Sequence, residues 1–152
     1  MAIIQGSLMN QIKLQSKKRI LIGLTSHSSL INTDSTTGLW LGEFTDPYYE
    51  FKNKGYTITL ASPKGGIIPI DPMSELTEHI TSSNRMYLED EVAKHALKHT
   101  ILLEDVEIPD YDAVFYPGGH GPMFDLANDA VSGQLILDSL TLGKPVGLVC
   151  HG

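Results

Sequence analysis

Short apolar runs rich in β-branched residues alternate along the chain with segments whose apolar residues recur at helical spacing. The runs are RILIGLT, YTITLAS, DAVFYPGG and PVGLVC, at 19–25, 56–62, 112–119 and 145–150. Apolar runs of this length, bounded by turn residues, are typical of strands that are buried on both faces. We therefore predict a strand at each of these four positions.

Three segments carry helical spacing. The apolar face of the first is formed by Trp40, Phe44, Tyr48 and Phe51, at intervals of four, four and three. This helix either begins near Leu41 with Pro47 in its first turn or uses Asp46–Pro47 as its cap and first residue. Gly55 ends it in both cases. The same spacing predicts further helices over 85–99 and 129–142.

Strands that alternate with helices predict an α/β fold, a three-layer sandwich with a mostly parallel sheet and helices on both faces. Ligand-binding loops are then expected at the carboxyl ends of the strands. We assign this sandwich to a single domain over 18–152, with an irregular, turn-rich loop at 63–72. Residues 1–17 are predicted to be a flexible amino-terminal arm.

Composition narrows the functions that such a fold can have. The 152 residues are 41% hydrophobic and 19% charged, which is typical of globular proteins. The net charge of −7, with one short basic run at 17–19, argues against a nucleic-acid binder, which needs a broad basic face. No segment approaches the roughly 18 apolar residues that cross a bilayer, and the first residues lack a leader-like pattern. We expect a soluble, cytoplasmic protein without membrane contact.

Cys150 is the single cysteine, so it is either an inert buried side chain or a reactive thiol. It ends the last predicted strand and is followed by His151 and Gly152. A nucleophile on a sharp strand-to-helix turn needs a small residue two positions later, and the start of a helix favours the thiolate. The glycines of 117–119 end another strand on the same rim, where their amides can face an oxyanion. These neighbours favour the reactive thiol.

Glu43 and three histidines are further candidates, each with a structural alternative. Glu43 stands among apolar residues at the start of a helix, a setting that favours a protonated carboxyl group able to share its proton with a neighbour. The alternative is a solvated carboxylate that only stabilises the start of the helix. His120 orients substrate, binds metal or makes a structural hydrogen bond. His95 and His99 have the helical spacing of metal ligands, but no third ligand is evident. We expect a solvated helix face there and no metal site.

Four segments together resemble one family. They are TGLWLGEFTDPYYEF (37–51), ASPKGGIIPIDPMS (61–74), YPGGHGPMFDL (116–126) and GLVCHG (147–152). In this order and spacing they resemble the amino-terminal part of the ThiJ/PfpI superfamily, which has the class I glutamine amidotransferase-like (flavodoxin-like) fold. Within it, the resemblance is strongest to the branch of glyoxalase III enzymes and heat-shock chaperones.

The resemblance implies roles for individual residues. Cys150 would be the nucleophile, His151 its basic neighbour and Glu43 the acid that hydrogen-bonds the thiol. Gly118, Gly119 and His120 would form the oxyanion and substrate-binding side, with the His151 amide contributing to the oxyanion hole.

The resemblance also implies a function: conversion of methylglyoxal, a small dicarbonyl, to lactate without glutathione and without a cofactor. It leaves two alternatives, a holdase chaperone for unfolded client proteins and a deglycase or amidase-like cysteine hydrolase. Relatives form homodimers and continue past the nucleophile with a helix, further strands and an acid that orients the histidine. We therefore expect an incomplete domain in these 152 residues. Whether they perform the chemistry alone is a separate question.

Overall fold

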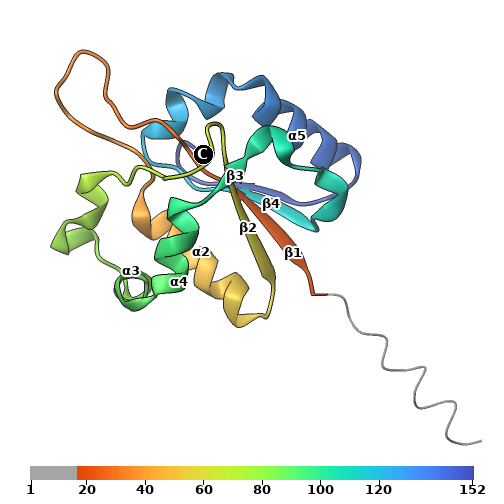
Figure 1. The fold of residues 1–152 in the computed structure, drawn as a ribbon, viewed down its shortest axis with the longest axis horizontal. Coiled ribbons are helices and arrows are strands. Elements are labelled where there is room, and N and C mark those ends of the chain that lie inside the picture. The colour runs from red at the N-terminus through yellow and green to blue at the C-terminus, as the bar shows by residue number, and fades with distance from the viewer. Residues whose placement is uncertain (1–16) are drawn as a thin grey trace, which may run out of the picture.

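The structure is a computed structural model, and it describes residues 17–152. Its centre is a five-stranded parallel sheet in the order β3-β2-β1-β4-β5 (Figure 1). The strands are β1 (Arg19–Gly23), β2 (Thr57–Ser62), β3 (Ile101–Leu102), β4 (Ala113–Tyr116) and β5 (Val146–Leu148). The four predicted strands are therefore confirmed. β3 was not predicted, because two residues are too few for an apolar run to stand out.

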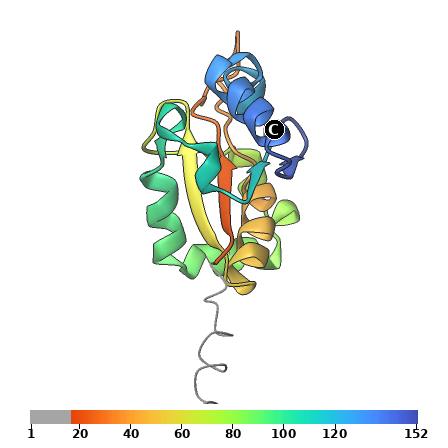
Figure 2. The same cartoon turned by 90° about the vertical axis from the view of Figure 1, so that its right-hand side faces the viewer.

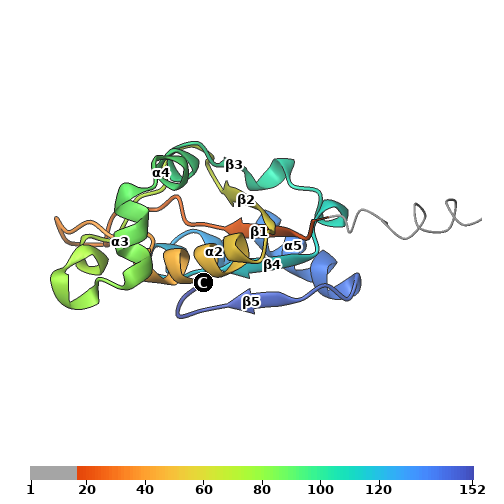
Figure 3. The ribbon, with the colours of Figure 1, turned by 90° about the horizontal axis from the view of Figure 1, so that it is seen from below.

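Helices cover both faces of the sheet, which confirms the three-layer α/β prediction (Figures 2 and 3). The helices are α2 (Leu41–Asn53), α3 (Ser82–Glu89), α4 (Glu91–Lys98) and α5 (Ala130–Thr141). Buried residues of α2 and α4 share one core with the sheet, and α3 contributes Tyr87 to it. The other face is covered by α5 and by short 3-10 turns over 103–111.

The alternation of side chains along each strand divides the apolar residues between the two cores. In β1, Ile20 and Ile22 face the core of α2 and α4, whereas Leu21 faces the core of α5. Tyr116 of β4 lies fully buried in the second core, where its hydroxyl oxygen accepts a hydrogen bond of 3.1 Å from Ser132 Oγ. The period of two explains why successive residues of β1 from Ile20 to Ile22 are all apolar: both faces of the strand are buried.

Two helix predictions need correction. The single helix expected over 85–99 is two helices, because Asp90 has extended backbone and caps α4 by accepting from the amides of Val92 and Ala93. The first helix does begin at Leu41, as one alternative held, but Pro47 then lies in its second turn rather than its first. Gly55 follows the end of the helix with φ +75°, as predicted.

The remaining segments agree with their predictions where the structure describes them. The loop over 63–72 is irregular up to Asp71, with only isolated bridges to other segments, and Pro72 begins a 3-10 turn. The arm predicted for 1–17 lies outside the described residues, apart from Lys17. Within 17–152, none of the helices combines the length and the hydropathy that crossing a bilayer requires.

Candidate functional site

The predicted site residues meet at the carboxyl ends of β4 and β5. These strands are paired up to Tyr116 and Leu148, and the Val149 amide extends the ladder by donating to the Tyr116 carbonyl at 3.1 Å. The segments beyond them, 117–121 and 149–152, therefore lie side by side. This is the edge at which parallel α/β sheets place ligand-binding residues.

Cys150 occupies the turn that follows β5. Its φ is +58°, a left-handed conformation that L-residues with a side chain rarely adopt. The thiol is exposed, and its Sγ lies 3.5 Å from His151 Nδ1. Backbone of this kind is held in place only when its surroundings determine it, and such positions cluster at functional sites.

Gly118 and Gly152 allow the turn to approach β4 closely. A Cβ on Gly118 would lie 2.8 Å from the Cys150 Cβ and 2.7 Å from the His151 amide nitrogen. A Cβ on Gly152 would lie 2.2 Å from the Tyr116 carbonyl oxygen. A small residue was predicted two positions after the cysteine, and Gly152 stands there. Its lack of a side chain lets it pack against the end of β4, a contact that the sequence did not predict.

His151 has a hydrogen-bond partner that fixes its tautomer. Its Nδ1 lies 3.2 Å from the carbonyl oxygen of Gly119. Because a carbonyl only accepts, this contact assigns the proton to Nδ1 in the neutral ring and leaves Nε2 as the basic nitrogen. His151 can therefore act on a bound molecule through Nε2 while Nδ1 stays tied to the neighbouring loop.

Glu43 stands in the first turn of α2 and reaches the same loop. Its Oε2 accepts a hydrogen bond of 2.8 Å from the Gly118 amide. The resemblance implied a hydrogen bond to the thiol, but in the structure Glu43 is directed at the end of β4 instead of the turn after β5. The Gly118 amide is consequently occupied. Among residues 17–152, the amides of Gly119 and His151 donate no hydrogen bond.

His120 continues the group, together with a residue that the sequence reasoning treated as a loop feature. The His120 ring is centred 5.4 Å from the His151 ring, and its Nδ1 lies 3.7 Å from Asp71 Oδ2. The Asp71 side chain is only 4% exposed. The signal that could have identified it is Asp71-Pro72, which caps a 3-10 turn (Pro72–Glu75) and so holds the carboxylate at a fixed place.

The pair His95 and His99 remains outside this group. Their rings stack at 3.9 Å, and the contact of His99 Nδ1 with the His95 carbonyl is 2.8 Å. No group of metal-ligating side chains occurs in residues 17–152. Nothing in this geometry calls for a bound ion at α4.

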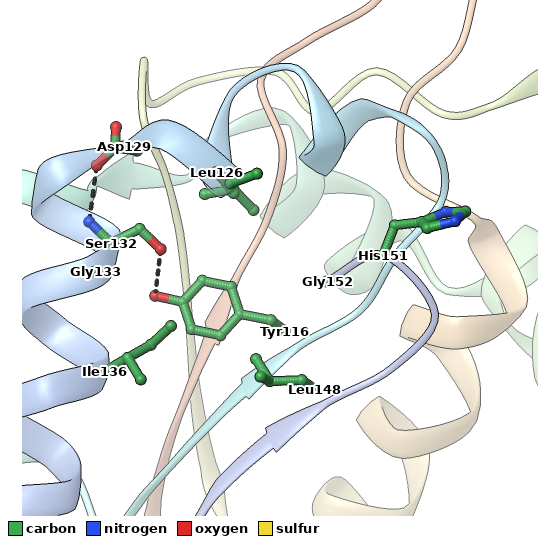
Figure 4. Close-up of a pocket in the computed structure, with 10 residues that line it drawn as sticks. Tyr116, Leu126, Asp129, Ser132, Gly133, Ile136, Leu148, His151 and Gly152 are labelled. Atoms are coloured by element: carbon green, nitrogen blue, oxygen red, sulfur yellow. Dashed lines mark hydrogen bonds between the residues drawn. The ribbon is translucent and has the colours of Figure 1, made fainter.

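A cavity of about 230 Å³ lies behind the turn, between α5 and the ends of β4 and β5 (Figure 4). Tyr116, Ile136 and Leu148 line it, and Figure 4 shows the His151 ring pointing away from Tyr116. Burial raises the pKa of the Tyr116 phenol, so the group stays neutral. The cavity is a predominantly apolar space that His151 and Gly152 border at the turn.

The sequence profile of the DJ-1/PfpI family matches residues 36–152, a range that includes every site residue described above. The chain belongs to the DJ-1/PfpI family. The ThiJ/PfpI resemblance of the four segments and the predicted flavodoxin-like fold are confirmed by this match and by solved structures of similar proteins.

Among curated DJ-1/PfpI relatives, the chain is 29% identical to Glyoxalase 3 of Candida albicans over 137 residues, 88% of this chain and 58% of that protein. It is 24% identical to the glutathione-independent glyoxalase HSP31 of Saccharomyces cerevisiae, covering 89% of this chain and 58% of the relative. The chain therefore spans less than two thirds of the length of these relatives.

Solved structures agree. Rapid Encystment Protein 24 kDa of Francisella tularensis is 40% identical and superposes with a TM-score of 0.82, over 88% of this chain and 59% of that one. The crystal structure of glyoxalase III from Candida albicans gives a TM-score of 0.78 at 29% identity, over 89% and 57% of the two chains.

Proposed function

We propose that the site performs glutathione-independent glyoxalase chemistry on a small α-oxoaldehyde, with Cys150 as nucleophile. The observation that carries the proposal is the exposed Cys150 thiol, which stands in a left-handed turn 3.5 Å from His151 Nδ1. Two relatives named as glyoxalases, from Candida albicans and Saccharomyces cerevisiae, support this reaction class.

The first step is addition of the thiol to the aldehyde. The Cys150 sulfur forms a bond to C1 of methylglyoxal, and the C1 oxygen takes up a proton, which gives a hemithioacetal. We assign stabilisation of the charge that develops on this oxygen to the amides of Gly119 and His151, which donate no hydrogen bond within residues 17–152.

The second step is an internal redox change that needs no cofactor. A base, His151 through Nε2 or Glu43, removes the proton from C1, and the resulting enediol is protonated at C2. C1 is thereby oxidised to a thioester and C2 reduced to an alcohol. Water then cleaves the carbon–sulfur bond, releasing lactate and restoring the thiol.

The role proposed for Glu43 combines two tasks. Its Oε2 holds the Gly118 amide, which fixes the loop beside Cys150, and its carboxyl group is one of the two candidate bases. His120, on the other side of His151, is proposed to hold the second oxygen of the substrate.

Two experiments test the proposal. Lactate formation from methylglyoxal without glutathione should be lost in Cys150→Ser, by at least 10³-fold, with an unchanged melting temperature. Methylglyoxal should also protect Cys150 from iodoacetamide, and at lower concentration in the native protein than in urea, because the folded site binds the aldehyde. Pyruvate, which lacks an aldehyde, is the control. Lactate formation that survives Cys150→Ser, or equal protection in urea, would overturn the proposal.

A second candidate function, a holdase chaperone, is favoured by a separate observation. Leu137 and Leu140 lie about one turn apart on α5 and, like Leu148 of β5, are more than half exposed. Exposed apolar surface can bind unfolded clients. Cys150→Ser separates the two functions, because it should leave suppression of citrate synthase aggregation unchanged. Hydrolysis of glycated protein or of amides by the same thiol would be recognised by its products, which contain no lactate.

A further inference from the structure

A cavity of about 510 Å³ lies beside the candidate site, on the far side of His120 from His151. Three segments that are distant in sequence form it: the loop over 30–36, Trp40 before α2, and the turn at 71–73. His120 lines it and is the contact between this cavity and the reactive group. A molecule bound in the cavity would therefore lie against the residues proposed to act on a carbonyl.

One end of the cavity is polar and firmly held. Asp71 Oδ2 accepts a hydrogen bond of 2.8 Å from Thr37 Oγ1, and Oδ1 accepts one of 2.9 Å from the Met73 amide. The same Oδ2 lies 3.7 Å from His120 Nδ1. Asp71 is buried and held at both oxygens, and Nδ1 is the ring nitrogen of His120 that lies near it, so Nε2 is the nitrogen left for a ligand oxygen.

The rest of the wall is largely apolar. This apolar wall is formed by Leu30, Trp40 and Met73. The Trp40 ring packs edge-on against His79, with ring centroids 5.0 Å apart. A three-carbon aldehyde with five heavy atoms occupies at most about 150 Å³ at the ~30 Å³ of each water-sized group in a liquid. The cavity is several times larger, within the range of about 300–1,000 Å³ that is typical of small-molecule sites.

The charges around the cavity select against anions. Asp34 and Asp71 both line it, and the whole chain carries a net charge of −7. A carboxylate in the cavity would face two like charges at close range. An uncharged ligand with one apolar end and one carbonyl end suits the wall and the polar end together.

We propose that this cavity holds the substituent of an uncharged α-oxoaldehyde larger than methylglyoxal, with a ring or branched alkyl group against Trp40 and Met73 and its inner oxygen at His120 Nε2. The identity of the reacting group rests on the proposed glyoxalase function. The cavity then makes Trp40, Met73 and the Asp71–His120 pair determinants of substrate size and charge.

Trp40 is the single tryptophan, so its indole N–H gives one resolved signal in a ¹H–¹⁵N spectrum of the labelled protein and reports on the cavity without any turnover. The probes are 2-hydroxyacetophenone, which carries a ring and is neutral; hydroxyacetone, which lacks the ring; and phenylglyoxylate, which carries the ring and a negative charge. We expect 2-hydroxyacetophenone to shift the signal saturably at a concentration at least tenfold lower than either of the others.

Met73→Lys should weaken that binding at least tenfold, because it places a polar chain on the apolar wall. Met86→Lys is the matched control, since Met73 is 56% and Met86 50% exposed and Met86 lies on α3, away from the cavity. Asp71→Asn should weaken binding of 2-hydroxyacetophenone more than that of 2-phenylethanol, which keeps the ring and the hydroxyl but lacks the ketone oxygen. An unmoved Trp40 signal, equal binding of all three probes, or equal effects of the two lysine variants would overturn the inference.

The two proposals fail in different ways. Lactate formation from methylglyoxal with an unmoved Trp40 signal would support the reaction and reject the cavity as its subsite. A selective Trp40 shift, with Cys150 unprotected by any aldehyde, would support the binding site and reject the reaction. In the expected case, phenylglyoxal has a KM at least tenfold below that of methylglyoxal, and Met73→Lys removes this difference in KM with little change in kcat.

Discussion

β1 and β5 are both parallel strands of one sheet, yet their surroundings differ. β1 is paired on both sides, by β2 and β4, and Leu21 and Ile22 have no exposed surface. Within residues 17–152, β5 is paired only with β4, and Leu148 is 54% exposed. The candidate nucleophile follows the second of these strands. We therefore expect substitutions around β1 to change stability and substitutions at the turn after β5 to change the proposed chemistry.

The largest effect on stability is expected from the core shared by β1 and α2. Phe44 is fully buried there and packs on Tyr48, with ring centroids 5.0 Å apart. Phe44→Ala should lower the free energy of unfolding by about 3–5 kcal/mol, since it removes a buried ring and leaves a cavity. Urea denaturation followed by circular dichroism measures it, with Ile67→Ala, at an exposed position, as control. A loss of unfolding free energy below about 1 kcal/mol would refute the claim that stability depends mainly on the core around β1.

At the site end of the same helix, Glu43→Gln should change activity and leave stability nearly constant. The amide oxygen of glutamine can still accept from Gly118, so the loop geometry is kept while the titrating group is lost. We expect a loss of carbonyl turnover of at least about 10²-fold, typical of a missing acid–base group. Glu50→Gln, an exposed position on the same helix, is the matched control. Full activity in Glu43→Gln would make Glu43 a structural residue.

Substitution of Asp90 should lower the free energy of unfolding by a smaller amount, and this amount should depend on pH. The hydrogen bond from Lys52, followed by that from the Ala93 amide, lowers the pKa of Asp90 to about 2. Its folded pKa lies below the unfolded value of about 3.9, so its contribution is complete above pH ~4 and is lost as the pH falls toward 2.

Asp90→Ala, which also removes the cap of α4, should cost about 1–2 kcal/mol at pH 7 and much less at pH 2. Asp90→Asn should keep part of the capping contribution and lose the pH dependence between pH 4 and 2. Glu89→Gln, at the neighbouring exposed position, serves as control. A cost for Asp90→Ala that stays the same from pH 7 to 2 would show that the carboxylate charge contributes nothing.

The smallest effect is expected at the end of β5. Because Leu148 remains 54% exposed, Leu148→Ala should cost less than about 1 kcal/mol, far below the value for a core leucine. Leu148→Lys tests the same surface differently. Sedimentation should show less self-association than in the wild type, since charge on an edge strand opposes pairing with another chain. A destabilisation comparable to that of Phe44→Ala would remove the contrast between the two strands.

The fold could be predicted from the sequence because its strands are long apolar runs and its first helix has a clear apolar face. Prediction failed where local rules compete. Asp90 interrupts a continuous helical pattern because its side chain caps the next helix more favourably than it continues the first. Pro47 was expected in a first turn, where its missing amide costs nothing, but α2 accommodates it one turn later.

The site was predictable only as far as topology allowed. The carboxyl ends of parallel strands fall on one edge, so Cys150, His151 and 118–119 could be brought together in advance. The partner of Glu43 depends on the direction of α2 relative to β4, which no local pattern encodes. The proximity of Asp71 to His120 was not predicted for the same reason, because it joins two loops 49 residues apart in sequence.

The strand order has a kinetic consequence. β1 precedes the other described strands, and one of its two partner strands lies far along the chain: Ile20 pairs with Ile58 of β2 but also with Ala113 of β4, 93 residues later. Until β4 emerges from the ribosome, β1 can pair only with β2, and its other edge is free. Pairings between distant segments form slowly because a long loop must close first. During translation, β1 and β2 should therefore be the segment most in need of protection by cellular chaperones.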